Sequence, residues 1–354
     1  MNLKITRSDS PKDLPKDESK LGFGNYFTDH MFIMNYDGGE GWHDGRIVPY
    51  GPIEIEPAAM VLHYGQEVFE GMKAYRAADD SIRLFRPKEN FKRLNHSNDR
   101  ICIPLIDEEY ALEALSELVR IDSRWVPKSE GCSLYIRPFI FAVDPHVGVR
   151  SGEHFLFIII LSPVGTYYPT GLSPVRIYTE TNYVRSIKGG TGTAKTGGNY
   201  AASIKAQNEA KNKNFTQVLW LDAIERKYIE EVGTMNVFFV IGDEVVTPTL
   251  DGSILSGITR MSVIELLRSW DIAVSERRLS IDEIVLAHDK GLLKEAFGTG
   301  TAAVVSPIGE LRVGERDLTL NGFEIGELSQ RLYDTLTGIQ WGTAKDLFGW
   351  VHPV

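Results

Sequence analysis

Apolar residues recur along this chain with two different spacings, one typical of helices and one typical of strands. Residues 107–120 place leucine, alanine and valine at helical intervals and crowd acidic residues into the first turn, which predicts a helix. Residues 154–161 are apolar after the first position, which predicts a strand buried on both faces. Because hairpins and helices alternate without a strict strand–helix–strand order, the pattern predicts two α+β domains rather than one doubly wound sheet.

The same criteria predict the other main elements. A hairpin over 237–248 turns at Gly242-Asp243, and Ser280 with Glu283 forms a capping-box pattern at the start of a helix. Further strands are expected at 133–143, 175–178, 217–221 and 302–305. Further helices are expected at 87–100, 199–211, 259–270, 280–290 and 323–337.

Polar and proline-rich stretches divide the chain into segments. Residues 1–22 are polar and contain two prolines, which predicts a flexible arm rather than a secretory signal. Residues 164–174 are rich in glycine and proline and predict an interdomain linker. The expected organisation is therefore a small α/β domain at 23–163 and a larger α/β domain at 175–354.

Composition and charge exclude several classes of function. The 354 residues are 43% hydrophobic, and 48 acidic residues outnumber 38 basic ones, which gives a formal net charge of −10. This acidity disfavours nucleic acids and anionic membranes as partners, and no apolar run is long enough to cross a bilayer. The eight histidines form no HExxH pattern, so no metal site is expected. The two cysteines form no CxxC pair, which favours a reduced, cytoplasmic protein.

Residues 188–202, KGGTGTAKTGGNYAA, hold the most informative pattern. Lys195 lies between two glycine-rich turns, on backbone that a bulky ligand can approach closely. Such a lysine can grip a phosphate, as in a phosphate-binding loop, or form an imine with an aldehyde. Which of these the lysine does decides the function of the chain.

The phosphate-loop interpretation has partial support. The motif GxxxxGK[ST] is matched from Gly189 to Thr196, except that alanine replaces the second glycine. The preceding residues are polar, whereas a phosphate-binding loop follows a buried apolar strand. Gly197-Gly198 also opposes a helix start directly after Lys195, so the helix is expected to begin at Asn199.

The imine interpretation needs further groups besides the lysine. A pyridoxal phosphate ring requires a carboxylate at its nitrogen, a donor at its ring oxygen and several donors for its phosphate. Candidates are Glu231 in EVGTMN, Tyr200 beside the lysine, and Arg100 at the end of a predicted helix. The residues at 256–259 lead into a helix, which suits an anion.

Six motifs occur between Phe23 and the C-terminus. They are GGTGTAKTGGNYAAS, EVGTMN, LSGITR, FGTGTAAVVSP, HYGQEVFEGMKAY and SLYIRP. Together they closely resemble the branched-chain amino-acid aminotransferases of the fold-type IV pyridoxal phosphate enzymes. The resemblance implies an α+β, two-domain fold like that of D-amino-acid aminotransferase. It also implies an active site at the domain interface and a pyridoxal phosphate lysine in the larger domain.

The resemblance implies a role for each matching residue. Lys195 would be the catalytic lysine, which forms the Schiff base with pyridoxal 5′-phosphate and shuttles a proton. Glu231 would lie at the ring nitrogen and Tyr200 at the ring oxygen. The other cofactor-binding residues would be Arg100, Thr234, Gly257, Ile258, Thr259 and Thr301. The substrate would be surrounded by Phe23, Tyr64, Phe69, Tyr135, Arg137, Val149, Tyr167, Thr234, Thr301 and Ala302.

The implied activity is reversible amino transfer between L-leucine, L-isoleucine or L-valine and 2-oxoglutarate. The aromatic and apolar residues would suit branched side chains, and Arg137 would accept the second carboxylate of L-glutamate. A homodimer is implied, in which the loop at 144–150 reaches the active site of the partner. Mammalian members carry a CxxC pair where this chain has Ala303 and Ser306, so no thiol switch is expected there.

Other interpretations stay open at this stage. A D-amino-acid aminotransferase or an aminodeoxychorismate lyase would share the lysine and the glutamate, and a phosphate-loop nucleotide-binding protein is a remote alternative. Each residue alone also has an ordinary structural explanation. Glu231 and its neighbour Glu230 would be surface acids at a strand end, and Arg100 would complement a helix dipole.

Overall fold

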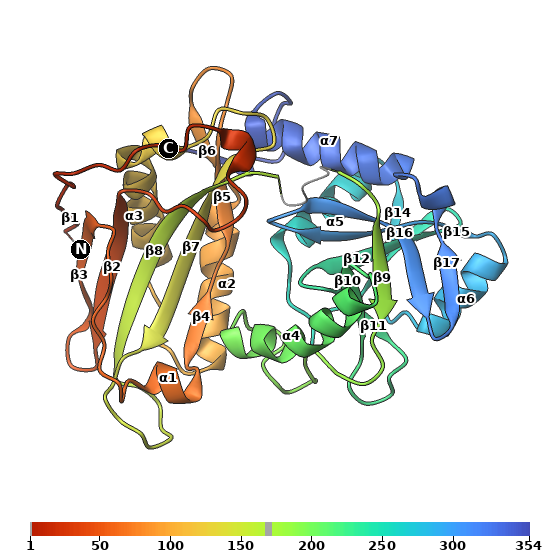
Figure 1. Ribbon diagram of the computed structural model, residues 1–354, viewed down its shortest axis with the longest axis horizontal. Coiled ribbons are helices and arrows are strands. Elements are labelled where there is room, and N and C mark those ends of the chain that lie inside the picture. Colours follow the sequence, from red (N-terminus) through yellow and green to blue (C-terminus); the bar gives the residue numbers. More distant parts are fainter. Residues whose placement is uncertain (1, 167–171) are drawn as a thin grey trace. The chain divides into compact units, whose positions relative to one another are not determined.

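The computed structural model describes residues 2–166 and 172–354, which form two compact units (Figure 1). Of these residues, unit 1 comprises 2–166, Ala194–Gly197 and Gly338–Val354, and unit 2 comprises 172–193 and Gly198–Thr337. Each unit combines a sheet with helices, so the predicted α+β class is confirmed. The segment of Lys195 belongs to unit 1, although its position in the sequence predicts the second domain. The predicted linker lies partly outside the described residues.

The described residues of unit 1 form one sheet of nine strands in the order β1-β3-β2-β8-β7-β5-β6-β18, with β4 paired to β7. Among them, only β1 and β3 run parallel. The strands are β1 (Lys4–Ile5), β2 (His30–Asp37), β3 (Gly41–Pro49), β4 (Glu67–Phe69), β5 (Met72–Arg76), β6 (Ile82–Phe85), β7 (Ser133–Ala142), β8 (His154–Val164) and β18 (Val351–Pro353). The helices are α1 (Met60–Tyr64), α2 (Pro87–Arg100) and α3 (Glu108–Ile121), with short 3₁₀ turns at Glu18–Lys20 and Ser123–Trp125.

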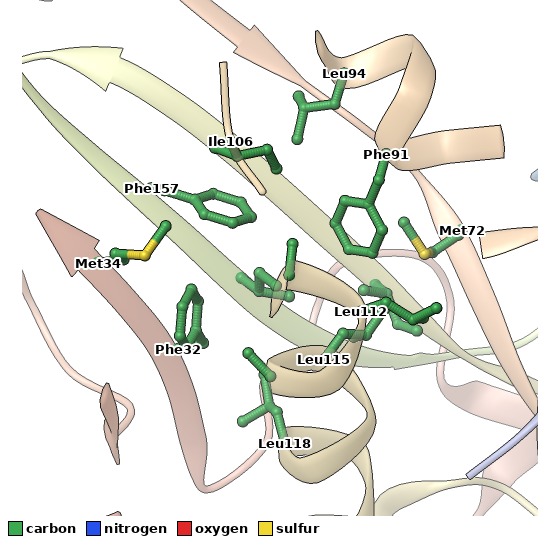
Figure 2. Packing of buried hydrophobic residues seen from close by; sticks show 14 of the residues in the cluster. Phe32, Met34, Met72, Phe91, Leu94, Ile106, Leu112, Leu115, Leu118 and Phe157 are labelled. Atoms are coloured by element: carbon green, nitrogen blue, oxygen red, sulfur yellow. The ribbon is translucent and has the colours of Figure 1, made fainter. Parts of the chain in front are cut away.

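Helices α2 and α3 cover one face of this sheet and bury its main core (Figure 2). Helix α3 begins where its sequence predicts, because the Asp107 side chain accepts the backbone N–H groups of Glu109 and Tyr110. Its apolar stripe then packs against the strands. Figure 2 shows Leu112, Leu115 and Leu118 of α3 with Phe91 and Leu94 of α2, facing Phe32 and Met34 of β2, Met72 of β5 and Phe157 of β8.

The alternation of β7 separates this core from the opposite face of the sheet. Leu134, Ile136 and Ile140 are buried in the core under the helices. Tyr135 and Arg137 are partly buried and, because successive side chains of a strand alternate, they lie on the other face. Burying each large apolar side chain contributes about 2 kcal/mol, so the core residues fix which face Arg137 occupies.

Parts of the N-terminal arm contact other residues of unit 1. Strand β1 pairs with β3, and the backbone N–H of Ser8 donates to Nε2 of His30 at 2.9 Å. The backbone N–H of Lys12 donates to the buried Asp29 at 2.7 Å. Polar composition alone predicted a flexible arm. The residues that contact the arm lie outside it in the sequence, so its own composition does not reveal these contacts.

The described residues of unit 2 form a second sheet of nine strands in the order β11-β10-β9-β16-β15-β12-β13-β14, with β17 paired to β16. Parallel and antiparallel neighbours are mixed. The strands are β9 (Val175–Thr179), β10 (Gln217–Leu221), β11 (Ile229–Val232), β12 (Asn236–Ile241), β13 (Glu244–Pro248), β14 (Ala273–Arg277), β15 (Leu293–Gly300), β16 (Val304–Val313) and β17 (Arg316–Thr319). The helices are α4 (Gly197–Asn212), α5 (Ile258–Ser269), α6 (Ile281–Asp289) and α7 (Glu327–Trp341), with a 3₁₀ turn at Asn321–Phe323.

Several predicted elements of unit 2 are confirmed and two are corrected. The hairpin turning at Gly242-Asp243 is β12 paired with β13, and the capping box is present because the N–H of Glu283 donates to Ser280 Oγ. Strand β15 was not predicted, because Lys294, Glu295 and two glycines interrupt its apolar pattern. Helix α4 begins at Gly197 rather than at Asn199.

The described residues also bear on three general expectations. Cys102 and Cys132 are both free, so they form no disulfide. Among residues 2–166 and 172–354, no helix is both long and apolar enough to span a bilayer. Within the same ranges, no group of three or more histidine, cysteine or acidic residues is arranged to hold a metal ion.

Candidate active site

Lys195 is fixed by its own backbone to two elements of unit 1. Its N–H donates to Ser97 Oγ of α2 at 2.9 Å, and its carbonyl accepts the N–H of Phe69 at the end of β4, also at 2.9 Å. The next residue, Thr196, donates its hydroxyl to the carbonyl of Glu67 at 2.7 Å. The lysine is therefore held on a rigid scaffold, while glycines on both sides leave its backbone sterically open.

A carboxylate explains why α4 begins earlier than predicted. The N–H of Gly197 donates to Glu67 Oε2 at 3.1 Å, so an acidic side chain satisfies the first turn and complements the helix dipole. A Cβ at Gly197 would lie 3.1 Å from Glu67 Oε1, which leaves little room for a larger residue. The late helix start was one argument against the phosphate-loop interpretation, and this structure removes that argument. The other argument stands, since residues 180–194 separate Lys195 from the end of the preceding strand β9.

The amine of Lys195 lies near a second cation across one aromatic ring. Lys195 Nζ is 5.0 Å from the centroid of the Phe69 ring, and Arg137 Cζ is 4.7 Å from the same centroid. Strand β4 pairs with β7 so that Phe69 is opposite Phe139, which puts Phe69 on the same side of the sheet as Tyr135 and Arg137. We call this surface of β4 and β7, which carries Phe69, Tyr135 and Arg137, the site face.

Arg137 has unused donor capacity on the site face. Its Nη2 donates to the Tyr135 hydroxyl at 3.2 Å, whereas its buried Nε has no partner among the described residues. Phe23 packs edge-on against Tyr135 with a centroid distance of 4.8 Å. The Tyr135 hydroxyl also lies where a Cβ at Gly71 would be, so this position requires glycine. A planar guanidinium framed by aromatic rings is well suited to hold a carboxylate.

A buried ion pair lies behind the lysine segment. Glu70 is fully buried, and Arg93 donates to it from Nε at 2.7 Å and from Nη2 at 2.9 Å. Burial opposes the ionisation of Glu70, but the charge and hydrogen bonds of Arg93, the charge of Lys195 and a hydrogen bond from Asn90 together hold its pKa below the ordinary value. The surroundings of Glu70, which include the charge of Lys195, therefore favour its anionic form.

The two arginines of α2 are placed differently. Arg100 is exposed at the C-terminal end of the helix. Arg93 is only 10% exposed and lies one turn before Ser97, the residue that holds the Lys195 backbone. Sequence reasoning named Arg100 and did not consider Arg93. The signal that could have found it is the spacing of four residues between Arg93 and Ser97, which puts both on one face of a helix.

Of three other residues expected near the substrate, two are exposed and one lies outside the described residues. The Tyr64 hydroxyl donates to the carbonyl of Val147, and Tyr64 itself is partly exposed. Val149, in the 144–150 loop, is 85% exposed. Asp144 anchors the base of that loop by accepting Arg150 and two backbone N–H groups. Tyr167 lies outside the described residues.

In unit 2, Glu231 is a buried carboxylate on β11 with two identified partners. Its Oε1 accepts the N–H of Leu255 at 2.9 Å, and its Oε2 lies 3.0 Å from Arg185 Nε. Arg185 is itself buried and donates from Nη2 to the carbonyls of Gly192, at 3.0 Å, and Ser253. The guanidinium thus ties the carboxylate to the loops around it and favours its anionic form.

The neighbouring Glu230 is buried, not a surface acid. It is 6% exposed, it accepts the Ser253 hydroxyl on Oε1, and its Oε2 has no partner among the described residues. Burial raises the pKa of Glu230 to about 7, against the opposing effects of the Ser253 hydrogen bond and the Arg185 charge. Sequence reasoning missed this because burial on both faces of β11 comes from tertiary packing.

The expected phosphate-binding residues lie at the start of α5. Gly257 is the N-cap residue and has no side chain to cap the helix, so the first N–H groups of α5 can serve an anion. A Cβ at Gly257 would lie 1.9 Å from Asn236 Oδ1, so any larger residue there would require the Asn236 side chain to move. Ile258 and Thr259 follow and are both buried.

Hydrogen bonds and close packing gather further unit 2 candidates at one end of the sheet. Asn236 donates to the Leu255 carbonyl and pairs with Thr299 across β12 and β15. Thr234 is exposed in the turn before β12, and Thr301 and Ala302 lie in the turn between β15 and β16. A Cβ at Gly298 would lie 2.8 Å from Met235 Cε, so the end of β15 packs closely on the 233–235 turn. Tyr200 lies apart from these turns in the sequence, in the first turns of α4.

Comparison with known proteins identifies the family. The model of the family described as "Amino-transferase class IV" matches residues 67–311, which is more than half of the chain. The chain belongs to this family.

The similar proteins within the family carry similar names. It is 57% identical over 354 residues to the "Branched-chain-amino-acid aminotransferase 2" of Bacillus subtilis (strain 168), covering 100% of this chain and 97% of the relative. A crystal structure of the Escherichia coli branched-chain amino acid aminotransferase superposes with a TM-score of 0.76 at 27% identity, covering 91% of this chain and 98% of that one. The branched-chain aminotransferase of the archaeon Thermoproteus uzoniensis, crystallised with norvaline, also has a TM-score of 0.76 at 27% identity, covering 92% and 99%. The predicted fold type and the predicted resemblance are confirmed.

Proposed function

We propose that this chain catalyses reversible amino transfer between L-leucine, L-isoleucine or L-valine and 2-oxoglutarate, with pyridoxal 5′-phosphate as cofactor. The observation that carries the proposal is the arrangement around Phe69, where a backbone-anchored lysine amine and an arginine with an unused buried donor contact the same ring. An amine suits covalent capture of an aldehyde, and the arginine suits a substrate carboxylate. The family, and the names of the relatives above, support the choice of branched-chain substrates.

The residues present fit the cofactor. The uncapped start of α5 offers backbone donors for a phosphate, Glu231 is a buried carboxylate beside Arg185, and Lys195 supplies the amine. When bound, the cofactor would supply an aldehyde that combines with amines and a ring that stabilises negative charge at the substrate α-carbon. Tyr200, Thr234 and Thr301 stay in the proposal as further contacts, as the motifs imply.

Arg93 is our choice for the phosphate-binding arginine of unit 1, in place of Arg100. Its position one turn from Ser97 brings it to the helix face that holds Lys195, whereas Arg100 is exposed at the helix end. Its ion pair with Glu70 also fixes the guanidinium in one orientation, and a preorganised donor loses less entropy when it binds an anion.

Lys195 would act as both carrier and proton shuttle. When an amino substrate occupies the site, the free Lys195 Nζ would take the proton from the substrate α-carbon. It would hold that proton for return to the reacting atoms. The nearby anion Glu70, already paired with Arg93, would offset the positive charge that Nζ gains. The Glu231 carboxylate would accept a hydrogen bond from the protonated ring nitrogen. It would thereby keep the ring cationic.

The site face would select the substrate side chain. Phe23, Phe69 and Tyr135 provide apolar ring surface for an aliphatic chain, while Arg137 would hold the second carboxylate of glutamate. A homodimer, in which the 144–150 loop reaches the partner's site, is part of the proposal. It is supported by the exposure of Val147 and Val149, two apolar residues on that loop. A cytoplasmic location stays a prediction.

A substrate panel tests the proposal. The purified protein with added pyridoxal phosphate should convert L-leucine and 2-oxoglutarate into L-glutamate and should leave D-leucine and D-alanine unchanged. Conversion of D-amino acids in preference to L-leucine would favour the D-amino-acid aminotransferase alternative. Release of pyruvate from aminodeoxychorismate without an amino acceptor would favour the lyase alternative. Family membership leaves no support for a phosphate-loop protein.

A further inference from the structure

Glu67 is a carboxylate on the site face that none of the proposed roles uses. It is two residues before Phe69 on β4 and pairs across to Phe141, so it faces the same side of the sheet as Arg137. Single residues on strands are often structural, but this one adjoins both functional segments of unit 1.

Hydrogen bonds hold the Glu67 carboxylate against the lysine segment. The N–H of Gly197 donates to Oε2, and the Thr196 hydroxyl donates to the Glu67 carbonyl. These contacts engage Oε2 and the main chain, so the Oε1 side of the carboxylate is available for a proton. The backbone of the residue that follows Lys195 is thereby tied to the same strand that carries Phe69.

Arg137 on β7 is the cation that acts on Glu67. Lys73 of β5 pairs across to Tyr135 and so lies on the same side of the sheet, whereas Lys195 acts on Glu70, which is paired with Arg93 of α2. The Tyr135 hydroxyl is engaged by Arg137. Burial raises the pKa of Glu67, and the Gly197 N–H and the Arg137 charge act against that rise. Glu67 thus responds to what happens at Arg137.

We propose that Glu67 is a specificity-determining residue that lets one pocket accept both an aliphatic and an acidic side chain. With a branched aliphatic side chain on the site face, the ionised Glu67 balances the charge of Arg137. When glutamate or 2-oxoglutarate brings a second carboxylate to Arg137, a proton from solvent adds to a Glu67 carboxylate oxygen. This inference rests on the proposed function and deepens it.

Elementary electrostatics gives the reason. A partly buried guanidinium is costly next to an apolar side chain unless an anion balances it. Two carboxylates beside one guanidinium in a poorly solvated place repel each other, so one of them takes up a proton. Binding of an acidic substrate should therefore consume a proton and weaken as the pH rises, whereas binding of an aliphatic substrate should not.

Calorimetry on the wild-type holoenzyme tests this without any variant. The probes are glutarate and 4-methylvaleric acid, which share one carboxylate and differ in whether the other end is charged. Titrations in two buffers with different ionisation enthalpies should show that glutarate binds with uptake of about one proton and 4-methylvaleric acid with none. Equal proton uptake for the two acids, or none for either, would overturn the proposal.

The variant Glu67→Gln adds a kinetic test. It should make kcat/KM for 2-oxoglutarate insensitive to pH over the range in which the wild-type value falls, and it should lower kcat/KM for L-leucine. The ratio of the two should shift by about tenfold toward 2-oxoglutarate, as expected for removing one repulsive charge. The control Glu310→Gln removes a partly buried carboxylate paired with Arg176 in unit 2, and it should leave the ratio unchanged.

The outcomes separate the two proposals. If the wild-type enzyme fails to transaminate L-leucine at all, the proposed function fails. If it transaminates L-leucine but Glu67→Gln changes neither the ratio nor its pH dependence, only the role of Glu67 fails. A Glu67→Gln protein that does not fold still leaves the wild-type calorimetry to decide.

Discussion

The two units carry opposite balances of charge around their candidate residues. On the site face of unit 1, two cations, Lys195 and Arg137, lie near one aromatic ring, Phe69. At the end of the sheet in unit 2, two neighbouring carboxylates, Glu230 and Glu231, lie near a single buried arginine. The residues proposed to meet the cofactor and the substrate are therefore mainly cations in unit 1, whereas the two buried acids of β11 are the corresponding feature of unit 2.

This difference indicates how the two units divide substrate selection and catalysis between them. A cation beside aromatic rings, such as Arg137, discriminates between substrates, because it attracts a side-chain carboxylate and not an aliphatic chain. A buried carboxylate that never meets the side chain acts on the reaction of every substrate alike. Lys195 is the exception in unit 1, since its amine is needed for all substrates. Substitutions in the two units should accordingly give different kinetic patterns.

The largest effect is expected from Lys195→Ala. Loss of the amine removes both the covalent attachment and the proton shuttle, so kcat should fall by about 10⁴-fold or more for every substrate. The measurement is the rate of glutamate formation from L-leucine and 2-oxoglutarate. The control Lys188→Ala removes an exposed lysine of the same loop and should keep normal activity. Retained turnover in Lys195→Ala would remove the basis of the comparison.

The next effect, from Glu231→Gln, tests the role of unit 2. The neutral amide keeps the shape but loses the charge that holds the ring protonated, so kcat should fall by about 10²- to 10³-fold. Steady-state kinetics with L-leucine and with L-glutamate should show the same factor for both. A loss confined to one of the two substrates would contradict the assignment of unit 2 to substrate-independent work.

The opposite pattern is expected from Arg137→Met. Methionine keeps the length and loses the charge, so kcat/KM for 2-oxoglutarate should fall by about 10²-fold while that for L-leucine changes by less than about threefold. The control Arg120→Met removes an exposed arginine of α3 and should affect neither value. Equal losses for both substrates would show that Arg137 is structural.

The last effect, from Glu230→Gln, is on stability and leaves the reaction rate largely unchanged. Because the folded pKa of about 7 exceeds the ordinary 4.5, the protonated Glu230 stabilises the fold below about pH 4.5, and this contribution is lost as the pH rises to about 7. The rise in pKa corresponds to about 3 kcal/mol. Glutamine carries no proton to lose, so the variant should gain stability relative to wild type by up to that amount over this range. Urea unfolding at several pH values measures the gain, and parallel pH curves would contradict it.

Sequence reasoning reached those features that local signals determine. Helix α3 follows from its own periodicity and from Asp107, and the β12–β13 hairpin follows from Gly242-Asp243. The roles of Lys195 and Glu231 come from motifs that resemble a family, and they stay predictions. None of these predictions depends on knowing which distant residues come together in the fold.

The features that sequence reasoning missed depend on distant partners. Helix α4 starts early because Glu67, more than a hundred residues away, accepts the N–H of Gly197. The anchoring of the N-terminal arm depends on His30 and Asp29. Glu230 looked like a surface acid because nothing in its neighbourhood along the chain predicts burial. Arg93 was passed over for Arg100, since only the fold shows which of the two lies on the face that holds Lys195.

The most direct test of the account is to locate the amine that captures the cofactor. The protein loaded with pyridoxal phosphate would be reduced with borohydride, digested and analysed by mass spectrometry. The account predicts that the added mass of the reduced cofactor is found on Lys195 alone. Label on Lys73, on Lys188 or on any other lysine, with Lys195 unmodified, would contradict it.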